Sequence, residues 1–385
     1  MNRLTKKAAA SILCGAVALT ACSCGNTTGT ALTIDGEDIR AGIYIYYQSN
    51  ALNDAVTALE EEQPELDMYA EDFVLEDQTV GGLNINEWVK NKTIEYCREY
   101  VAVNKLFNEY GLSLSDEELS EINTNTNTLW TEENMYAQYI YGVDAMGEYY
   151  ESIGIGKESY KDISTAGYKR SAIFDHLYKE GGSLAVSADE LSAKVVADYA
   201  LVLSMEIDAE IASPETYLEM LNSGKTFSEV HQAYTKEDTI KRLEADIAKA
   251  EADGTEYTGT RPEELEVPLI SEKDMQTIVS KDSTTPSESY VTDVFAMTAG
   301  EAKIITVSET TTAADGTETT AMSYYLVKRL DIAADAEVME EYGETALHSL
   351  KDEEFNTTMK TAGSAYSVSE NAAAIKKYTI EKLDQ

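Results

Sequence analysis

The spacing of apolar residues changes twice along this chain, and the order of the changes constrains its fold more than any other feature. Between residues 31 and 194, apolar side chains recur mainly at three- and four-residue steps, as in amphipathic helices. Residues 199–207, YALVLSMEI, then form an apolar run typical of a buried strand, and further strand-like runs follow at 302–307 and 322–330. Helical spacing returns from about residue 332. This order predicts a helical domain, interrupted by a smaller α+β domain, to which the tail returns.

Local signals place the ends of several elements. Leu32 and Ile34 before the turn Asp35-Gly36 predict a short hairpin. The clearest helix is expected to end at Gly111, and its apolar stripe is Trp88, Val89, Lys92, Tyr96, Tyr100, Val103 and Phe107. A serine three residues before a glutamate predicts two capped helix starts, at Ser115–Glu118 and Ser187–Glu190.

The second half of the chain has weaker signals. Residues 213–237 predict a helix, a glycine break and a second short helix. The charged segment over 237–270 follows, with an exposed helix expected around Ile240, Leu243 and Ile247. The strands at 302–307 and 322–330 are expected to be joined by a long threonine-rich loop that turns at Asp315-Gly316. The tail predicts a helix to about residue 362 and then a strand over 376–383.

The N-terminus has the form of a bacterial secretion signal. Arg3, Lys6 and Lys7 precede fourteen small or apolar residues, too few to span a membrane. The segment ends in Leu19-Thr20-Ala21-Cys22, which resembles the lipobox where signal peptidase cuts before a cysteine that carries diacylglycerol. We therefore expect residues 1–21 to be removed, Cys22 to be lipidated, and residues 22–30 to form a tether. The alternative is a plain secretory signal followed by a chance cysteine.

Charge and hydropathy exclude several classes of protein. The chain has 385 residues, enough for two or three domains, and its mean hydropathy of −0.32 excludes a multi-span membrane protein. Seventy acidic residues against thirty basic ones give a formal charge of −40. Such a chain repels nucleic acids and anionic lipid surfaces and attracts basic or unfolded partners, although the acidity can also serve solubility alone.

Motifs for nucleotide, metal or hydrolytic chemistry are missing from the sequence. The stretch 154–159, GIGKES, lacks the first glycine and the final Ser or Thr of a phosphate-binding loop. His176, His231 and His348 are far apart, and no G-x-S-x-G motif occurs. Once Cys14 is removed and Cys22 is lipidated, Cys24 and Cys97 remain. Cys97 fits a small core residue, and no disulfide framework or metal spacing exists. We predict no cofactor, no nucleotide and no metal.

Tyrosine is the aromatic residue that this chain uses most, with 25 Tyr against 6 Phe. Tyr136, Tyr139 and Tyr141 lie close to methionines within residues 133–150. Tyrosine offers a large contact area that tolerates water, and methionine adapts its shape to different partners. These tyrosines are candidate peptide-binding residues. The alternative is that their rings form the ordinary core of a helical domain.

Several segments together resemble the PrsA-type foldase lipoproteins and the periplasmic chaperone SurA. The first is LTIDGEDIRAGIY at 32–44, similar to the hairpin that opens that chaperone domain. The others are VAVNKLFNEYGLSLSDEELSEIN at 101–123, GIGKESYKDISTAGYKRSAIFDHL at 154–177 and the tail AYSVSENAAAIKKYTIEKL at 365–383. Their order implies a helical chaperone domain over 31–194, completed by residues 332–385.

Residues 195–331 resemble a parvulin-type prolyl isomerase domain with the charged insert 237–270. The resemblance rests on the order strand, helix with LNSGKTFSEV, short helix and two strands. It places Tyr290, Phe295 and Met297 in the positions of the parvulin peptide-binding aromatic and apolar residues.

The catalytic positions depart from the parvulin pattern. Tyr325 stands where the histidine of the closing strand is expected, the opening strand 199–207 has no histidine, and Pro286 replaces the methionine of the proline pocket. One tyrosine hydroxyl cannot reproduce a histidine pair against a barrier of about 18–20 kcal/mol. The resemblance therefore implies a degenerate domain in which Tyr325 is a structural ring, and it leaves any isomerase activity open.

The predicted fold is α+β and multidomain: a mainly helical SurA-like domain with an inserted, degenerate parvulin-like domain. The implied function is a membrane-anchored, ATP-independent foldase that binds unfolded secreted polypeptides on the outer face of a cell membrane, in a Gram-positive envelope. Two alternatives are an active peptidyl-prolyl isomerase and a solute-binding lipoprotein, although two α/β lobes are expected of the latter.

Overall fold

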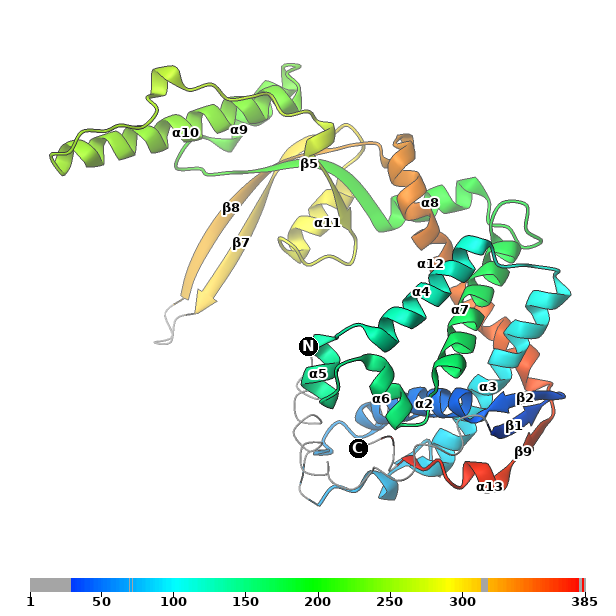
Figure 1. Ribbon diagram of the computed structural model, residues 1–385. Helices are drawn as coiled ribbons and strands as arrows, with labels where there is room; N and C mark the ends of the chain where they lie inside the picture. Colours follow the sequence, from blue (N-terminus) through cyan, green and yellow to red (C-terminus); the bar gives the residue numbers. More distant parts are fainter. Residues whose placement is uncertain (1–28, 69, 71, 313–317, 381–382, 384–385) are drawn as a thin grey trace. The chain divides into compact units, whose positions relative to one another are not determined.

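Two units make up the computed structural model, which describes residues 29–68, 70, 72–312, 318–380 and 383 (Figure 1). The first unit comprises the described residues up to Ala185 together with those from Lys351 onward. The second unit is Val186–Leu350. The long helix α12 (Ala336–Ser364) contributes its first part to the second unit and its last part to the first. Cys22 lies outside the described residues.

The first unit is mainly helical. Its helices are α2 (Ala41–Glu62), α3 (Ile85–Glu109), α4 (Asp116–Thr131), α5 (Met135–Tyr141), α6 (Met146–Ser152), α7 (Lys157–Tyr178), the end of α12, α13 (Ala372–Ile375) and the 3₁₀ turn η2 (Leu75–Asp77). Its strands are β1 (Thr30–Ile34), β2 (Glu37–Arg40), β3 (Thr79–Val80), β4 (Leu83–Asn84) and β9 (Val368–Glu370).

The two ends of the described chain meet in a three-stranded antiparallel sheet of order β2-β1-β9. The predicted hairpin is confirmed by β1 and β2, which turn at Asp35-Gly36. The predicted strand over 376–383 is wrong, because the pairing strand β9 comes earlier. The Asn371 side chain accepts a hydrogen bond from the Ala374 backbone N–H and starts α13 directly after that strand, so the chain leaves the sheet there.

The predicted ends of the main helices are confirmed. Helix α3 ends before Gly111, whose φ of +66° suits glycine. Ser115 and Glu118 form a capping box, with the Glu118 N–H donating to the Ser115 side chain at 3.2 Å and Ser115 N–H to Glu118 at 2.6 Å. Cys97 on α3 is fully buried, as expected of a small core residue.

The second unit is built on a four-stranded antiparallel sheet of order β6-β5-β8-β7. Its strands are β5 (Tyr199–Ile207), β6 (Gln276–Ser280), β7 (Ala302–Thr312) and β8 (Glu318–Arg329). Its helices are α8 (Ala188–Asp198), α9 (Pro214–Asn222), α10 (Phe227–Ala252), α11 (Glu288–Ala296) and the start of α12, with 3₁₀ turns η3 (Pro262–Glu264), η4 (Lys273–Met275) and η5 (Ile332–Ala334).

Alternate residues of β5 pack in two separate apolar clusters, because successive strand side chains point to opposite faces. Ala200 and Val202 pack in a cluster that contains residues of α11. Leu203, Met205 and Ile207 pack with residues of α9 and α10. Strand β5 has the bounds that its apolar run predicted.

Two predictions for this unit are wrong. The short helix after the glycine break and the expected exposed helix around Leu243 are one element: a capping box of Thr226 and Glu229 starts α10, which runs for 26 residues into the charged segment. Ion pairs four residues apart, such as Lys241–Glu237 and Arg242–Asp238, support that continuation. The threonine-rich segment between the last strands is also mostly strand, paired from Ser308↔Met322 to Thr312↔Glu318, because β-branched threonine suits strands.

Strand β6 was not predicted from the sequence, and the two units have other boundaries than the predicted domains. By its contacts α8 belongs to the second unit, as does α12 up to Leu350. Across the described residues, no helix has the length and apolar character needed to cross a membrane.

Candidate functional site

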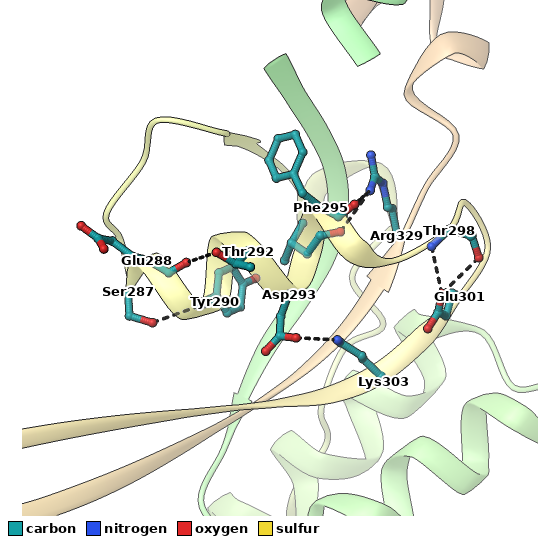
Figure 2. Close-up of polar contacts among 11 residues, drawn as sticks. Ser287, Glu288, Tyr290, Thr292, Asp293, Phe295, Thr298, Glu301, Lys303 and Arg329 are labelled. Atoms are coloured by element: carbon teal, nitrogen blue, oxygen red, sulfur yellow. Dashed lines mark hydrogen bonds and ion pairs between the residues drawn. The ribbon is translucent and has the colours of Figure 1, made fainter. Parts of the chain in front are cut away.

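Helix α11 lies against one face of the second unit's sheet and is fixed at both ends (Figure 2). At its start the Tyr290 backbone N–H donates to the Ser287 side chain at 3.1 Å. At its end, Arg329 Nη1 donates to the carbonyl oxygens of Val294 and Phe295 in the last turn and of Met297 directly after it, at 3.1, 2.9 and 2.7 Å. Arg329 therefore ties the helix end to strand β8, and the position of the candidate residues on α11 is set by the sheet.

Tyr290 and Tyr325 meet in this face. The ring centroids are 5.2 Å apart and the ring planes are inclined by 71°, an edge-to-face contact. Tyr290 is 4% exposed, and its hydroxyl donates to Ser204 Oγ at 3.0 Å. Tyr325 is half-buried, and burial is the main factor that raises the pKa of both phenols. Both rings thus remain neutral at physiological pH and pack in the apolar cluster of the sheet.

The other two predicted residues of this face differ in accessibility. Met297 is 3% exposed and buried in the cluster. Phe295 is half-buried and borders a cleft of about 500 Å³ between α11 and the loop that follows β6. This cleft is lined by Lys281, Asp282, Ser283, Thr284, Glu288, Val291, Thr292 and Phe295. The structure therefore brings all four predicted residues together, with Phe295 facing the cleft.

Acid–base chemistry on this face is limited. Strands β5 and β8 contain no histidine, and the unit's histidines lie on α10 and α12. His231 on α10 is half-buried, and this burial lowers its pKa. The polar groups close to Tyr325 are Glu206, its partner in the strand register, and Ser323. These groups can hydrogen-bond a peptide carbonyl, but they include no imidazole.

The candidate tyrosines of the first unit lie on the short helix α5. Tyr136 and Tyr139 are exposed, at 52% and 72%, beside Met135 at 86%. Tyr141 is half-buried and stacks on Tyr149 with centroids 3.7 Å apart. The two remaining rings of the predicted cluster therefore project from the surface instead of forming core.

A continuous run of tyrosine rings leads from α5 across this unit, with neighbouring centroids between 3.7 and 6.4 Å apart. We refer to it as the tyrosine series, and its members in spatial order are Tyr136, Tyr141, Tyr149, Tyr150, Tyr160, Tyr46 and Tyr47. Trp130 also stacks on Tyr150, at 5.9 Å. Burial raises the pKa of Tyr150 to about 12, so its hydroxyl remains a hydrogen-bond donor.

The tyrosine series ends in a cleft of about 630 Å³ formed by α2, α3 and α7, which we call the tyrosine cleft. It is lined by Tyr46, Tyr47, Asn50, Tyr96, Glu99, Tyr100, Val103, Tyr160, Ile163, Ser164, Ala166, Gly167, Tyr168, Arg170 and Ser171. Its size and its aromatic walls with a few polar groups are typical of ligand sites. This cleft was not predicted from the sequence, because the spacing of Tyr96 and Tyr100 places both rings in the apolar stripe of a helix. The one sequence signal for the cleft was that these two residues of the stripe are tyrosines, whose hydroxyl groups favour a partly accessible position.

Metal binding has no candidate in the part of the chain that the structure describes, since it contains no cluster of three or more His, Cys, Asp or Glu side chains with suitable geometry.

No protein-family model matches the chain, and no curated protein matches it. Among solved structures it is similar to the foldase protein PrsA from Lactococcus lactis, at 14% identity over 91% of this chain and 99% of that one, with a TM-score of 0.30. It is also similar to the foldase protein PrsA from Streptococcus pneumoniae str. Canada MDR_19A, at 13% identity over 82% of this chain and 100% of that one, with a TM-score of 0.30. Similarities this distant assign no activity to the chain.

Proposed function

We infer that this chain is an extracytoplasmic chaperone of the foldase class that binds unfolded polypeptides without ATP. The observation that carries the proposal is the tyrosine series, which leads from the exposed Tyr136 ring on α5 to the tyrosine cleft. Tyrosine gives a large contact area for little loss of rotamer entropy and tolerates water, so such a surface suits many different chains. The lipid anchor at Cys22 and the location outside the cell membrane are parts of the proposal that rest on the N-terminal sequence alone.

The second unit acts in this proposal as a degenerate parvulin-like domain and a second binding surface. Its element order, β5-α9-α10-β6-α11-β7-β8, contains the strand, two helices and two final strands on which the resemblance rests. Phe295 beside its cleft supplies an apolar contact for a peptide, whereas the Tyr290 hydroxyl is already engaged by Ser204. With no imidazole on that face, we expect binding without measurable isomerisation.

The solute-binding alternative receives no support from the observed sheets. Two α/β lobes with parallel strands are expected of that class. The strand pairs described here are all antiparallel, in sheets of two, three and four strands.

The test compares two activities of the purified chain. One assay follows aggregation of an unfolded protein, and the other follows cis–trans isomerisation of a short X-Pro peptide. We expect clear suppression of aggregation and no acceleration of isomerisation. An acceleration that Tyr325→Phe abolishes would make the chain an isomerase, and failure to suppress aggregation would reject the chaperone proposal.

A further inference from the structure

Glu99 is the one acidic side chain among the lining residues of the tyrosine cleft. It lies on α3, and its side chain is 21% exposed. Its closest cation is Arg170, with Nη1 4.0 Å from Oε2, which is the outer limit of an ion pair. Burial is the main cause that raises the pKa of Glu99, so the neighbouring cations do not fully compensate the desolvation of the carboxylate.

Arg170 is held mainly by groups other than Glu99. Its Nη2 donates to the Asn356 side chain on α12, and its guanidinium carbon lies 4.9 Å from the centre of the Phe355 ring. A guanidinium that stacks on a ring and binds an amide has a fixed position, because its donors form a rigid fork. The Arg170 guanidinium is therefore directed toward α12, and its distance from the Glu99 carboxylate remains long, at 4.0 Å.

The nearby lysines are also engaged by another carboxylate. Glu95, one helical turn before Glu99, pairs with Lys360 at 2.7 Å and with Lys92 at 3.1 Å. Hydrogen bonds and charge from these lysines lower the Glu95 pKa in spite of its burial. The two glutamates thus differ in kind: Glu95 is neutralised by the protein itself, and Glu99 faces the cleft with its charge incompletely matched.

Tyrosine rings surround the Glu99 side of the cleft. Tyr47 lies 6.0 Å from Tyr96 and 6.1 Å from Tyr100, centre to centre. Aromatic faces attract cations, and the attraction is stronger where the contact is desolvated. Lys92 already lies 4.9 Å from the centre of the Tyr96 ring, which illustrates that a lysine suits this environment. Rings next to an acid favour a long basic side chain, whose aliphatic stem can lie on the rings.

We propose that the tyrosine cleft takes a lysine or arginine side chain of an extended client segment, with the cation paired to Glu99 and the stem packed on Tyr47, Tyr96 and Tyr100. This inference rests on the proposed chaperone function and names its preferred client chemistry, basic residues flanked by apolar ones. The formal charge of −40 favours the approach of such segments at low salt.

The experiment compares two fluorescent peptides that differ at one central residue, lysine in one and acetyl-lysine in the other. Binding to the full chain and to Glu99→Gln is measured by fluorescence anisotropy. We expect the unmodified chain to bind the lysine peptide about tenfold more tightly, the effect of roughly 1.4 kcal/mol. Glu99→Gln should reduce this ratio to near one and leave binding of the acetyl-lysine peptide unchanged.

Glu87→Gln is the matched control, because it removes the same charge from an exposed residue of α3 that does not line the cleft. Its peptide ratio should equal that of the unmodified chain. A preference for lysine that survives in Glu99→Gln, or is lost equally in both variants, would overturn the proposed site.

Suppression of aggregation, measured in parallel, separates the two proposals. If the chain suppresses aggregation but binds both peptides equally or neither, the cationic preference is wrong and the chaperone function stands. If it neither suppresses aggregation nor binds a peptide, both are wrong.

Discussion

Tyr290 and Tyr325 illustrate how a single residue can belong to a functional pattern and still serve packing. The Tyr290 hydroxyl donates to Ser204, and the Tyr290 ring makes an edge-to-face contact with the Tyr325 ring within an apolar cluster. A group that twists a peptide bond must direct a free donor at the reacting amide. The Tyr290 hydroxyl is instead committed to strand β5, which supports a structural role for it.

Tyr290→Phe tests this role. The change removes one hydrogen bond and leaves the part-buried Ser204 hydroxyl without that partner, so the free energy of unfolding should fall by about 1–2 kcal/mol. Chemical denaturation followed by circular dichroism measures the effect. Binding of client proteins should not change, since the ring remains in place. A variant as stable as the original chain would contradict a structural role for this hydroxyl.

Tyr136 and Tyr139 represent the opposite case, large rings that the fold leaves outside. Because they are 52% and 72% exposed, replacing both with alanine should change stability by less than about 0.5 kcal/mol for each position. The double variant should nevertheless lose a substantial part of its ability to suppress aggregation. Leu184→Ala, at a side chain that is 48% exposed and lies outside the tyrosine series, is the control. If the original chain, the double variant and Leu184→Ala suppressed aggregation equally well, α5 would not be part of the binding surface.

Residue roles were predictable from the sequence where the neighbours are local. The burial of Cys97 follows from its place on the apolar face of one helix. The environment of Glu99 depends on Arg170 and Asn356, which come from two other helices, and no spacing within α3 indicates it. The tyrosine cleft was missed for the same reason.

At the scale of elements, the capping box of α4 was predicted from the sequence and is present in the structure. Ser115→Ala removes the acceptor of the Glu118 backbone N–H and should lower the free energy of unfolding by about 1 kcal/mol. Trp130 lies near the end of α4, so tryptophan fluorescence during urea unfolding detects the loss. Ser120→Ala, on the exposed side of the same helix, should have little effect. If the two variants were equally stable, the cap would not contribute.

The capping box of Ser115 and Glu118 also predicts that the free energy of unfolding depends on pH. Hydrogen bonds from the Ser115 backbone N–H and hydroxyl lower the pKa of the Glu118 carboxyl. A lowered pKa in the folded state means that the charged form adds stability above the unfolded value of about 4.3, and that this stability is lost as the pH falls through the folded pKa. Glu118→Gln should therefore be less stable than the original chain at neutral pH and equally stable in acid. A stability difference that persists below that range would assign the effect to packing.

Elements were predictable where a strong local signal marks both ends. Strand β5 lies between α8 and a turn, and its bounds follow from its apolar run. Helix α10 was predicted as two separate helices because its far half buries little apolar surface and depends on pairs such as Arg242–Asp238. Strand β6 is a five-residue element, and its pairing with β5 rather than its own sequence defines it as a strand.

At the scale of the whole molecule, the chain leaves the first unit at Ala185 and returns to it at Lys351. The returning tail supplies β9 to the sheet and the buried Ile380 to the core of the first unit. Both tryptophans, Trp88 and Trp130, belong to this unit, and none belongs to Val186–Leu350. Tryptophan fluorescence therefore follows the first unit, whereas circular dichroism follows both.

A chain that ends at Ser364 should lose stability in the first unit alone. Loss of the β1–β9 pairing and of the 1%-exposed Ile380 removes at least about 2 kcal/mol, so the thermal midpoint seen by fluorescence should fall by roughly 5 °C or more. Leu326→Ala, at a fully buried residue of β8, is the converse variant: it should destabilise the second unit by about 2–5 kcal/mol and shift only the dichroism signal. If Leu326→Ala also lowered the midpoint seen by tryptophan fluorescence, the two units would unfold as one cooperative structure, with α12 as the shared element.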